Sequence, residues 1–309
     1  MTTNETPSEN TAPQVFPLFT EEGSAEAVNA RIGPSTGPRL RTVMEAAVRH
    51  LHSFVKEVEP THDEWETAIE FLSETGRMCT DWRQEYVLLS DVLGVSMLVE
   101  TINHRRGGGG TENTVLGPFH VQGAPHYPNG ADIRLDERGI PLVVRGQVRD
   151  GEGRPIVGAK IDVWQTNEDG FYDVQQPDQQ PRWNLRGLFT SDAEGRYGFI
   201  TARPRFYPIP DDGPVGKLLG ALGRHPNRPA HIHFIVTAPG YDQVVTHIFA
   251  SDCPYLEQDA VFGVKDTLVV DIIPRDDASA AAAFGVTNPF TAIEWNFDLV
   301  PAPGSDTVS

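Results

Sequence analysis

Cysteines and basic residues are scarce in this sequence. Its 309 residues include two cysteines, Cys79 and Cys253, which are too few for a disulfide framework in a chain of this length. Unpaired thiols are typical of a reducing compartment, so we expect a cytoplasmic protein. Lysine and arginine together number 25 against 43 aspartates and glutamates, and the formal net charge is −18. Such an acidic surface argues against nucleic acid and anionic membranes as partners.

Long apolar runs are absent as well. No uninterrupted apolar stretch reaches the roughly 18 residues that a transmembrane helix needs, so no membrane span is expected. Residues 1–14 carry neither the basic start nor the apolar stretch of a signal peptide. The H-E-x-x-H and C-x-x-C patterns of common zinc sites are also missing. The remaining composition, 39% apolar and 22% charged, is that of a globular protein.

The N-terminal third divides into a tail and a helical region. Residues 1–37 are rich in Thr, Asn, Ser, Pro, Gly and Glu and show no apolar period. This composition predicts a mobile tail that packs loosely at residues 15–19. Residues 38–106 repeat apolar side chains every three or four positions, which predicts helices. Their apolar stripes are wide enough to pack together and to bury a stripe on a partner.

Three helices are expected in this region. The first covers residues 39–58 and stops before a proline. The second opens with the capping box of Thr61 and Glu64 and ends near Gly76. The third is capped by Asp81 and continues until the run RRGGGG breaks it.

Residues 107–300 have the texture of a β domain. Short β-branched runs alternate with Gly, Pro and Asp, and no helical period separates them. The runs are LVVRGQV (142–148), AKIDVWQ (159–165), GRYGFIT (195–201), AHIHFIVTA (230–238), QVVTHIFA (243–250) and TLVVDII (267–273). They predict an antiparallel sandwich or barrel, so the chain should be mainly β with an N-terminal helical part. Residues 277–285 are expected to form a loop or a helical turn, and residues 301–309 a disordered tail.

Two histidines can present metal ligands from one strand. His231 and His233 lie in AHIHFIVT, and side chains two apart on a strand point to the same face. A pair of neutral imidazoles suits Zn, Fe, Cu or Ni. The alternative is that one histidine is a core or surface residue and the other merely alternates with it. By itself, the pair is a weak indication of a metal.

Two of the seven tyrosines stand close to turns in the β region. Tyr172 follows the run that ends at residue 165, and Tyr207 lies between prolines that would hold its backbone stiffly. Taken singly, each is better explained as a half-buried packing residue with a satisfied hydroxyl.

Five segments between residues 38 and 275 carry a resemblance to a known family. They are LGPFH (116–120), DVWQTNEDGFY (162–172), NLRG (184–187), YPIPDDGPVG (207–216) and RPAHIHF (228–234). In these segments the chain resembles the intradiol ring-cleavage dioxygenases, which carry non-haem Fe(III) on a β-sandwich core. The resemblance implies one Fe(III) per subunit, with Tyr172, Tyr207, His231 and His233 as its ligands. The segments SDVLGVSMLV (90–99), APGY (238–241), VTHIF (245–249) and QDAVFGVK (258–265) are most similar to hydroxyquinol 1,2-dioxygenases.

The resemblance also implies roles for residues beside the iron. Arg228 would stabilise negative charge that develops on the substrate, and Tyr207 would leave the iron to accept a substrate proton. The alternative for Arg228 is an ordinary surface or salt-bridge arginine. His247 stands where catechol-cleaving relatives tend to carry glutamine, and it is either a polar core residue or a donor close to the iron ligands.

The substrate pocket implied by the resemblance is apolar with a few polar anchors. Its walls would be Leu88, Asp91, Val115, Leu116, Gly117, Pro118, Phe119, Ile209, Pro210, Asp211, Arg228 and Val261. Plain core packing is the alternative for Leu88, Val115 and Val261. Asp91 stands among leucines and valines, where a carboxyl group needs a partner. It either accepts a hydrogen bond from a third substrate hydroxyl or caps a nearby turn.

The activity implied by the resemblance is the opening of an aromatic ring with O2 between two iron-bound hydroxyls. With hydroxyquinol (benzene-1,2,4-triol) the product would be 3-hydroxy-cis,cis-muconate, equivalent to maleylacetate. Catechol and chlorocatechol are alternative substrates, because one substituent in an apolar pocket is worth only about 1–3 kcal/mol. A metal-free ligand-binding sandwich and a zinc or iron hydrolase are the alternatives from other classes. The likeness further implies a homodimer paired through helical region 38–106.

Overall fold

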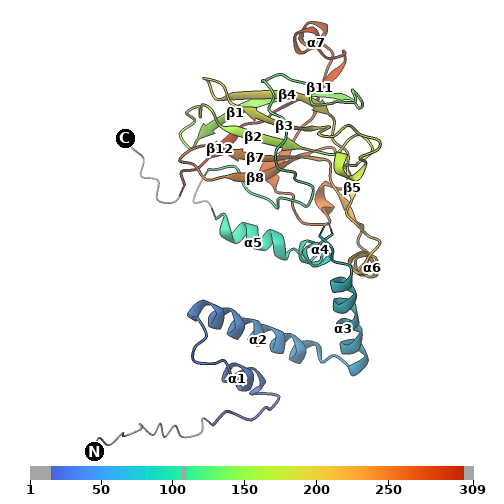
Figure 1. Cartoon of the computed structure of the whole chain (residues 1–309). Coiled ribbons are helices and arrows are strands. Elements are labelled where there is room, and N and C mark those ends of the chain that lie inside the picture. The colour runs from blue at the N-terminus through green and yellow to red at the C-terminus, as the bar shows by residue number, and fades with distance from the viewer. Residues whose placement is uncertain (1–14, 82, 106–108, 303–309) are drawn as a thin grey trace, which may run out of the picture. The chain divides into compact units, whose positions relative to one another are not determined.

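The computed structural model describes residues 15–81, 83–105 and 109–302 (Figure 1). The chain falls into two compact units, one ending at Ser73 and the other beginning at Glu74. Among the described residues, no helix has both the length and the apolar character to cross a membrane. Cys79 and Cys253 are free thiols, as predicted.

The first unit is helical. It contains α1 (Ser24–Asn29), α2 (Pro38–Val58) and most of α3 (His62–Arg77). The predicted bounds of α2 and α3 are confirmed to within about a residue. The capping box is also confirmed, because the Thr61 amide donates to Glu64 Oε2 (2.8 Å) and the Glu64 amide donates to Thr61 Oγ1 (3.3 Å).

The predicted tail contains one helix that the sequence pattern does not reveal. α1 has six residues, fewer than two turns, so it is too short to show an apolar period. It lies beside α2, where Asn29 Nδ2 donates to the carbonyl of Glu45 (3.3 Å). Phe19 contacts α2 edge-on, with its ring 6.3 Å from that of His52. Residues 1–14, the rest of the predicted tail, lie outside the described residues.

The prediction of a single third helix is wrong. Two helices, α4 (Glu85–Val92) and α5 (Val95–Asn103), occupy this segment. Gly94 between them has φ +73°, a left-handed conformation that ends α4 and that glycine adopts without strain. Asp81 does not cap α4, whose N-cap residue is Gln84.

Two five-stranded sheets form the β domain. One contains β1 (Pro141–Asp150), β4 (Arg196–Ala202), β10 (Ile273–Arg275), β11 (Phe290–Glu294) and β12 (Phe297–Leu299). The other contains β3 (Arg186–Thr190), β2 (Lys160–Trp164), β7 (His231–Thr237), β8 (Val244–Ala250) and β9 (Val269–Val270), in that order. A small two-stranded sheet pairs β5 (Tyr207–Pro208) with β6 (Asn227–Arg228). The predicted sandwich is confirmed.

Most neighbouring strands pair antiparallel, as the predicted sandwich implies, but both sheets also contain parallel pairs. The pairs β1–β4, β10–β11, β2–β3, β2–β7 and β7–β8 are antiparallel. β11 and β12 both pair with β1 in parallel, and β9 pairs with β8 in parallel. β11 and β12 are runs of five and three residues that sequence reasoning did not identify as strands, and their partner lies far away in the chain.

Short helices complete the β domain. α7 (Ala278–Phe284) confirms the helical turn, and the Asp277 side chain caps it by accepting from the amides of Ser279 and Ala280. α6 (Pro214–Ala221) was not predicted. Single turns of 3-10 helix occur at Asp173–Gln175, Leu256–Gln258 and Asp266–Leu268. At the predicted C-terminal tail, Pro301 forms a bridge with Tyr241, and residues 303–309 lie outside the described residues.

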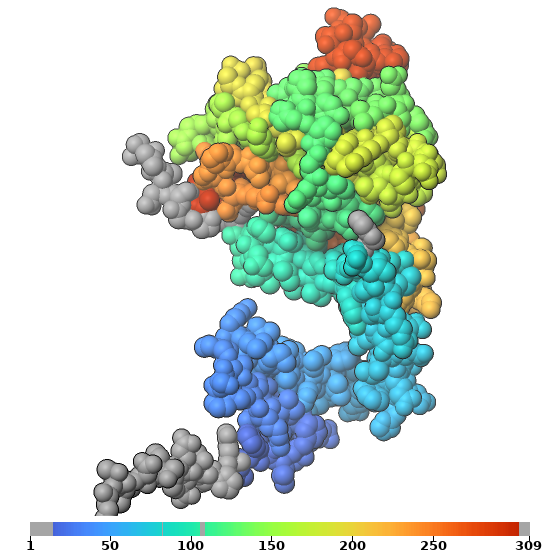
Figure 2. Space-filling model, in the orientation of Figure 1, coloured from blue at the N-terminus to red at the C-terminus, as the bar shows by residue number. Residues whose placement is uncertain are grey.

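The alternation of β7 determines where the candidate site lies. Ile232, Phe234 and Val236 are buried in the apolar core between the sheets. Because neighbouring side chains on a strand point to opposite faces, His231 and His233 face away from that core. α4 and α5 lie along the sandwich below β7 and β8 (Figures 1 and 2).

Gly146 in β1 has no room for a side chain, which leads to a stability prediction. A Cβ atom there would lie 1.5 Å from the carbonyl oxygen of Trp295, between β11 and β12. Gly146→Ala should therefore lower the free energy of unfolding by about 3 kcal/mol or more, at the upper end of overpacking costs. Gly151→Ala is the matched control, because nothing lies within 4 Å of its added methyl group. Equal urea midpoints for the two variants would contradict this account.

Candidate metal centre

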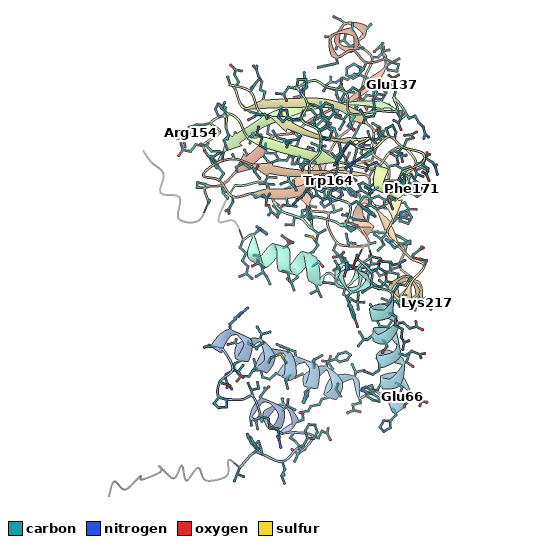
Figure 3. All side chains as sticks on the ribbon, in the orientation of Figure 1. Glu66, Glu137, Arg154, Trp164, Phe171 and Lys217 are labelled. Atoms are coloured by element: carbon teal, nitrogen blue, oxygen red, sulfur yellow. The ribbon has the colours of Figure 1, made fainter. Side chains whose placement is uncertain are left out.

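Two imidazoles from β7 form the base of the candidate site. The Nε2 atoms of His231 and His233 lie 3.1 Å apart, and both side chains are buried. The His231 Nδ1 atom lies 2.6 Å from the carbonyl oxygen of Pro229, which orients the ring. The indole of Trp164, labelled in Figure 3, stacks on His233 with ring centroids 4.6 Å apart. The Nε2 atoms of the two histidines therefore converge on the same point, where both could bind one metal ion.

Two phenol oxygens meet these nitrogens. Tyr172 reaches the site from the loop after β2, and Tyr207 from β5. The Tyr172 hydroxyl lies 2.9 Å from His233 Nε2 and 3.3 Å from the Tyr207 hydroxyl. The structure thus brings together all four predicted ligands, from three separate segments of the chain.

The donor set fits a highly charged metal ion. Burial raises the pKa of Tyr172 well above its usual value, and the neighbouring Tyr207 adds to that effect. Burial likewise lowers the pKa of His231 to about 3 and that of His233 well below its usual value. The imidazoles are therefore neutral and free to ligate, whereas the phenol of Tyr172 needs a cation beside it to ionise. Two phenol oxygens and two imidazole nitrogens that crowd together suit Fe(III) better than Zn, whose usual ligands include no tyrosine.

His247 joins this cluster, although sequence reasoning assigned it no definite role. It pairs directly with His233 across the β7–β8 ladder, and the two ring centroids are 4.0 Å apart. Ligand atoms of His231, His233 and His247 all lie within 4.8 Å of one another. The Nδ1 atom of His247 contacts the hydroxyl of Thr114, and its buried Nε2 has no partner in the described part of the chain. The Tyr172 oxygen lies 2.9 Å from His233 Nε2 and 3.3 Å from the Tyr207 oxygen, which favours the set of two tyrosines and two histidines.

Arg228 brings a positive charge to the same place. β6 pairs it directly with Tyr207, and its Nη1 atom lies 3.5 Å from His231 Nε2. The side chain is buried, which excludes the surface alternative. Burial lowers the pKa of Arg228, but the charge and hydrogen bond of Asp259, together with Tyr207 and Tyr172, outweigh that effect and raise the pKa, so the guanidinium stays charged.

A second buried ion pair supports the other side of the site. Arg186 Nε donates to Asp173 Oδ1 (2.6 Å), and Arg186 Nη1 donates to the carbonyl of Phe119 (2.8 Å). The guanidinium carbon lies 5.8 Å from the ring centroid of Tyr172, on which Phe119 also stacks at 4.5 Å. Sequence reasoning quoted this arginine only as part of a motif. The sequence feature that could have identified Arg186 is its place as a charged residue at the start of a buried strand, β3.

A cavity of about 900 Å³ is lined in part by a loop that reaches His233. The predicted wall residues that line it are Leu88, Asp91, Val115, Leu116, Gly117, Pro118, Phe119 and Pro210. The loop 116–119 connects cavity and donors, because a Cβ atom on Gly117 would lie 3.1 Å from His233 Cε1. Ser90, Ser96 and Gln175 also line the cavity and were not predicted.

Four predicted wall residues lie elsewhere. Ile209 and Val261 belong to a buried apolar cluster on which Leu88 packs, so they stand behind the cavity wall. Arg228 belongs to the donor cluster described above. Asp211 is exposed, and the structure does not bring it to the cavity.

Asp91 is the acidic group in the cavity wall. Burial raises the pKa of its carboxyl group, and a hydrogen bond with Ser96 only partly offsets that effect. The side chain caps neither α4 nor α5. The turn-capping alternative therefore finds no support among the described helices.

Comparison with known proteins gives matches along most of the chain. A family model described as "Catechol dioxygenase N terminus" matches residues 37–111, and one described as "Dioxygenase" matches residues 115–302. A hydroxyquinol 1,2-dioxygenase of Rhizobium sp. (strain MTP-10005) is 54% identical, over 91% of this chain and 96% of its own. A catechol 1,2-dioxygenase of Candida albicans is more distant, at 41% over 79% of this chain and 82% of its own.

Solved structures agree with these matches. The crystal structure of a hydroxyquinol 1,2-dioxygenase from Pseudomonas putida DLL-E4 superposes with a TM-score of 0.86. That protein is 46% identical, and the match covers 91% of this chain and 99% of that one. Fold, sequence and the arrangement of donors point the same way: the chain belongs to the intradiol dioxygenase family.

Proposed function

We propose that this protein is an iron enzyme that cleaves hydroxyquinol with O2 between two adjacent hydroxyls. Its Fe(III), one per subunit, would be held by Tyr172, Tyr207, His231 and His233. The observation that carries the proposal is the meeting of two phenol oxygens and two imidazole nitrogens close to a loop that lines a cavity of about 900 Å³. Similarity to the Rhizobium hydroxyquinol 1,2-dioxygenase supports the reaction.

The protein's own groups would bind the diol and handle its protons. When bound, Fe(III) would supply a Lewis acid for the two oxygens of the diol and would make the ring reactive toward O2. Tyr207 Oη would accept one of the two protons that the diol loses. Tyr172 is contacted by both the Phe119 ring and the Arg186 guanidinium, which suits a ligand that stays in place. Arg228 would stabilise negative charge on the ring without competing for the metal.

The choice of a triol over a diol rests on Asp91. It lies on α4 in the cavity wall, where its carboxyl group can accept a hydrogen bond from a third ring hydroxyl. Both oxygen atoms of O2 enter the product, so hydroxyquinol gives 3-hydroxy-cis,cis-muconate, equivalent to maleylacetate. Catechol and chlorocatechol remain the alternative substrates. Neither has a third hydroxyl that could donate to the Asp91 carboxyl group. The unpaired thiols favour a cytoplasmic location for the enzyme.

A homodimer is the second part of the proposal. None of the 21 residues of α2 is buried within the chain. Large apolar side chains are exposed along one stripe of this helix: Leu40, Val43, Met44, Leu51, Phe54 and Val55. A second copy of the chain would cover such a stripe, as expected for an isologous interface.

The first prediction concerns the metal ligands. Purified protein should be wine-red from phenolate-to-Fe(III) charge transfer and should consume O2 with hydroxyquinol. His231→Ala should lose iron, colour and at least about 99% of activity, because one of four ligands is gone. Tyr207→Phe should retain iron but lose activity to a similar degree. Colourless wild-type protein that binds zinc or no metal would favour the hydrolase or the binding module instead.

The second prediction concerns Asp91. Asp91→Asn should reduce kcat/KM for hydroxyquinol by about 10- to 100-fold, the effect of losing one charged hydrogen bond. The kcat/KM for catechol should change by no more than about threefold, since catechol lacks the third hydroxyl. Steady-state rates on both substrates measure the two effects. A parallel loss on both would assign Asp91 to structure rather than to substrate choice.

The third prediction concerns subunit pairing. Phe54→Glu should shift the protein from dimer toward monomer in sedimentation-velocity runs at micromolar concentration, because it places a charge in the apolar stripe. Arg49→Glu is the control, since residue 49 lies on the opposite face of the same helix. Wild-type protein that sediments as a monomer would refute the dimer.

A further inference from the structure

Arg228 is held by a carboxylate to which neither sequence reasoning nor the family resemblance assigns a role. Arg228 Nε lies 3.2 Å from Asp259 Oδ1, and Arg228 Nη2 lies 3.3 Å from Asp259 Oδ2. The side chains are only 3% and 2% exposed, so water does not screen the pair. We propose that Asp259 is a positioning residue, which fixes the Arg228 guanidinium so that its Nη1 edge faces the substrate site.

The shape of the guanidinium determines which of its N–H groups remain free when Asp259 is bound. The group is planar, with five N–H donors in a rigid fork. Asp259 takes the edge formed by Nε and Nη2, which leaves Nη1 on the side of His231, 3.5 Å from its Nε2. A carboxylate on that one edge determines both where the positive charge lies and which donors remain free for a substrate oxygen.

Asp259 is itself fixed by its own loop. Its Oδ1 accepts from the Val261 amide (3.2 Å), and its Oδ2 accepts from the Gly263 amide (2.9 Å). Burial alone would raise the pKa of Asp259, but the charge and hydrogen bonds of Arg228, with the Val261 amide and the electrostatic effect of His231, together hold it below its usual value, so the carboxylate is ionised. Four N–H groups therefore converge on one charged carboxylate, and the arginine cannot turn without breaking that arrangement.

Gly263 provides the space in which the pair meets. A Cβ atom there would lie 2.9 Å from Arg228 Nη2 and 3.0 Å from Asp259 Oδ2. The loop also carries Val261, which packs in the apolar cluster behind the cavity wall. Segment 259–263 thus has two contacts with the site. Asp259 holds the charged Arg228 side chain, and Val261 packs behind the cavity wall.

The role of Asp259 rests on the proposed function, and Asp259→Asn tests it. The amide keeps the shape of the side chain but removes its charge. We expect wild-type iron content and charge-transfer absorbance, a KM for hydroxyquinol within about threefold, and a kcat reduced about 100-fold, as for the loss of one oriented charge-stabilising donor. Asp252→Asn is the control, because its carboxylate pairs with Arg203 on an exposed surface. It should leave kcat and KM within about twofold.

A double-mutant cycle separates positioning from general support. If Asp259 acts through Arg228, the variant Arg228→Gln/Asp259→Asn should have the same kcat as Arg228→Gln alone. This comparison also decides the matter if Asp259→Asn does not fold, because the double variant buries no unpaired charge. Urea unfolding of the metal-free proteins gives a readout without turnover, in which the double variant should be less destabilised than the sum of the single variants.

Several results would overturn the role of Asp259. They are an Asp259→Asn kcat within threefold of wild type, loss of iron from that variant, additive unfolding energies, or a double variant more than threefold slower than Arg228→Gln. A wild-type protein that turns over no diol or triol would instead refute the proposed function. Normal wild-type turnover with an unaffected Asp259→Asn variant would refute the positioning role alone.

Discussion

The alternation of side chains along β7 is the constraint from which the rest of the site follows. Ile232 and Phe234 are buried in the apolar core, which fixes the register of the strand and turns His231 and His233 toward the opposite face. A slip of one residue would bury both imidazoles in the core and remove them from the site. The hydrophobic packing of the sandwich therefore also orients the proposed metal ligands.

Buried ion pairs hold the groups that surround these ligands. Arg228 with Asp259 and Arg186 with Asp173 are both almost fully buried, and each arginine lies beside one of the tyrosines. A buried pair adds little net stability, but loss of one partner costs about 3–5 kcal/mol. Such pairs therefore restrict how the site can be arranged more than they stabilise the fold.

Sequence reasoning succeeded where the pattern is local. α2, α3 and the histidine pair follow from periods of 3.6 and two residues, and the Thr61–Glu64 box lies within one turn. It failed where the partner is distant. β11 and β12 pair with β1, which lies far away in the chain. Asp259 could not be singled out because its partner, Arg228, is 31 residues away. The break at Gly94 was missed because the apolar period continues on both sides of it.

The four converging donors come from the sandwich and its small two-stranded sheet, whereas Leu88 and Asp91 in the cavity wall come from α4. α4 contributes no donor to the cluster. A substitution on α4 would therefore alter part of the cavity wall without changing any of the four donors.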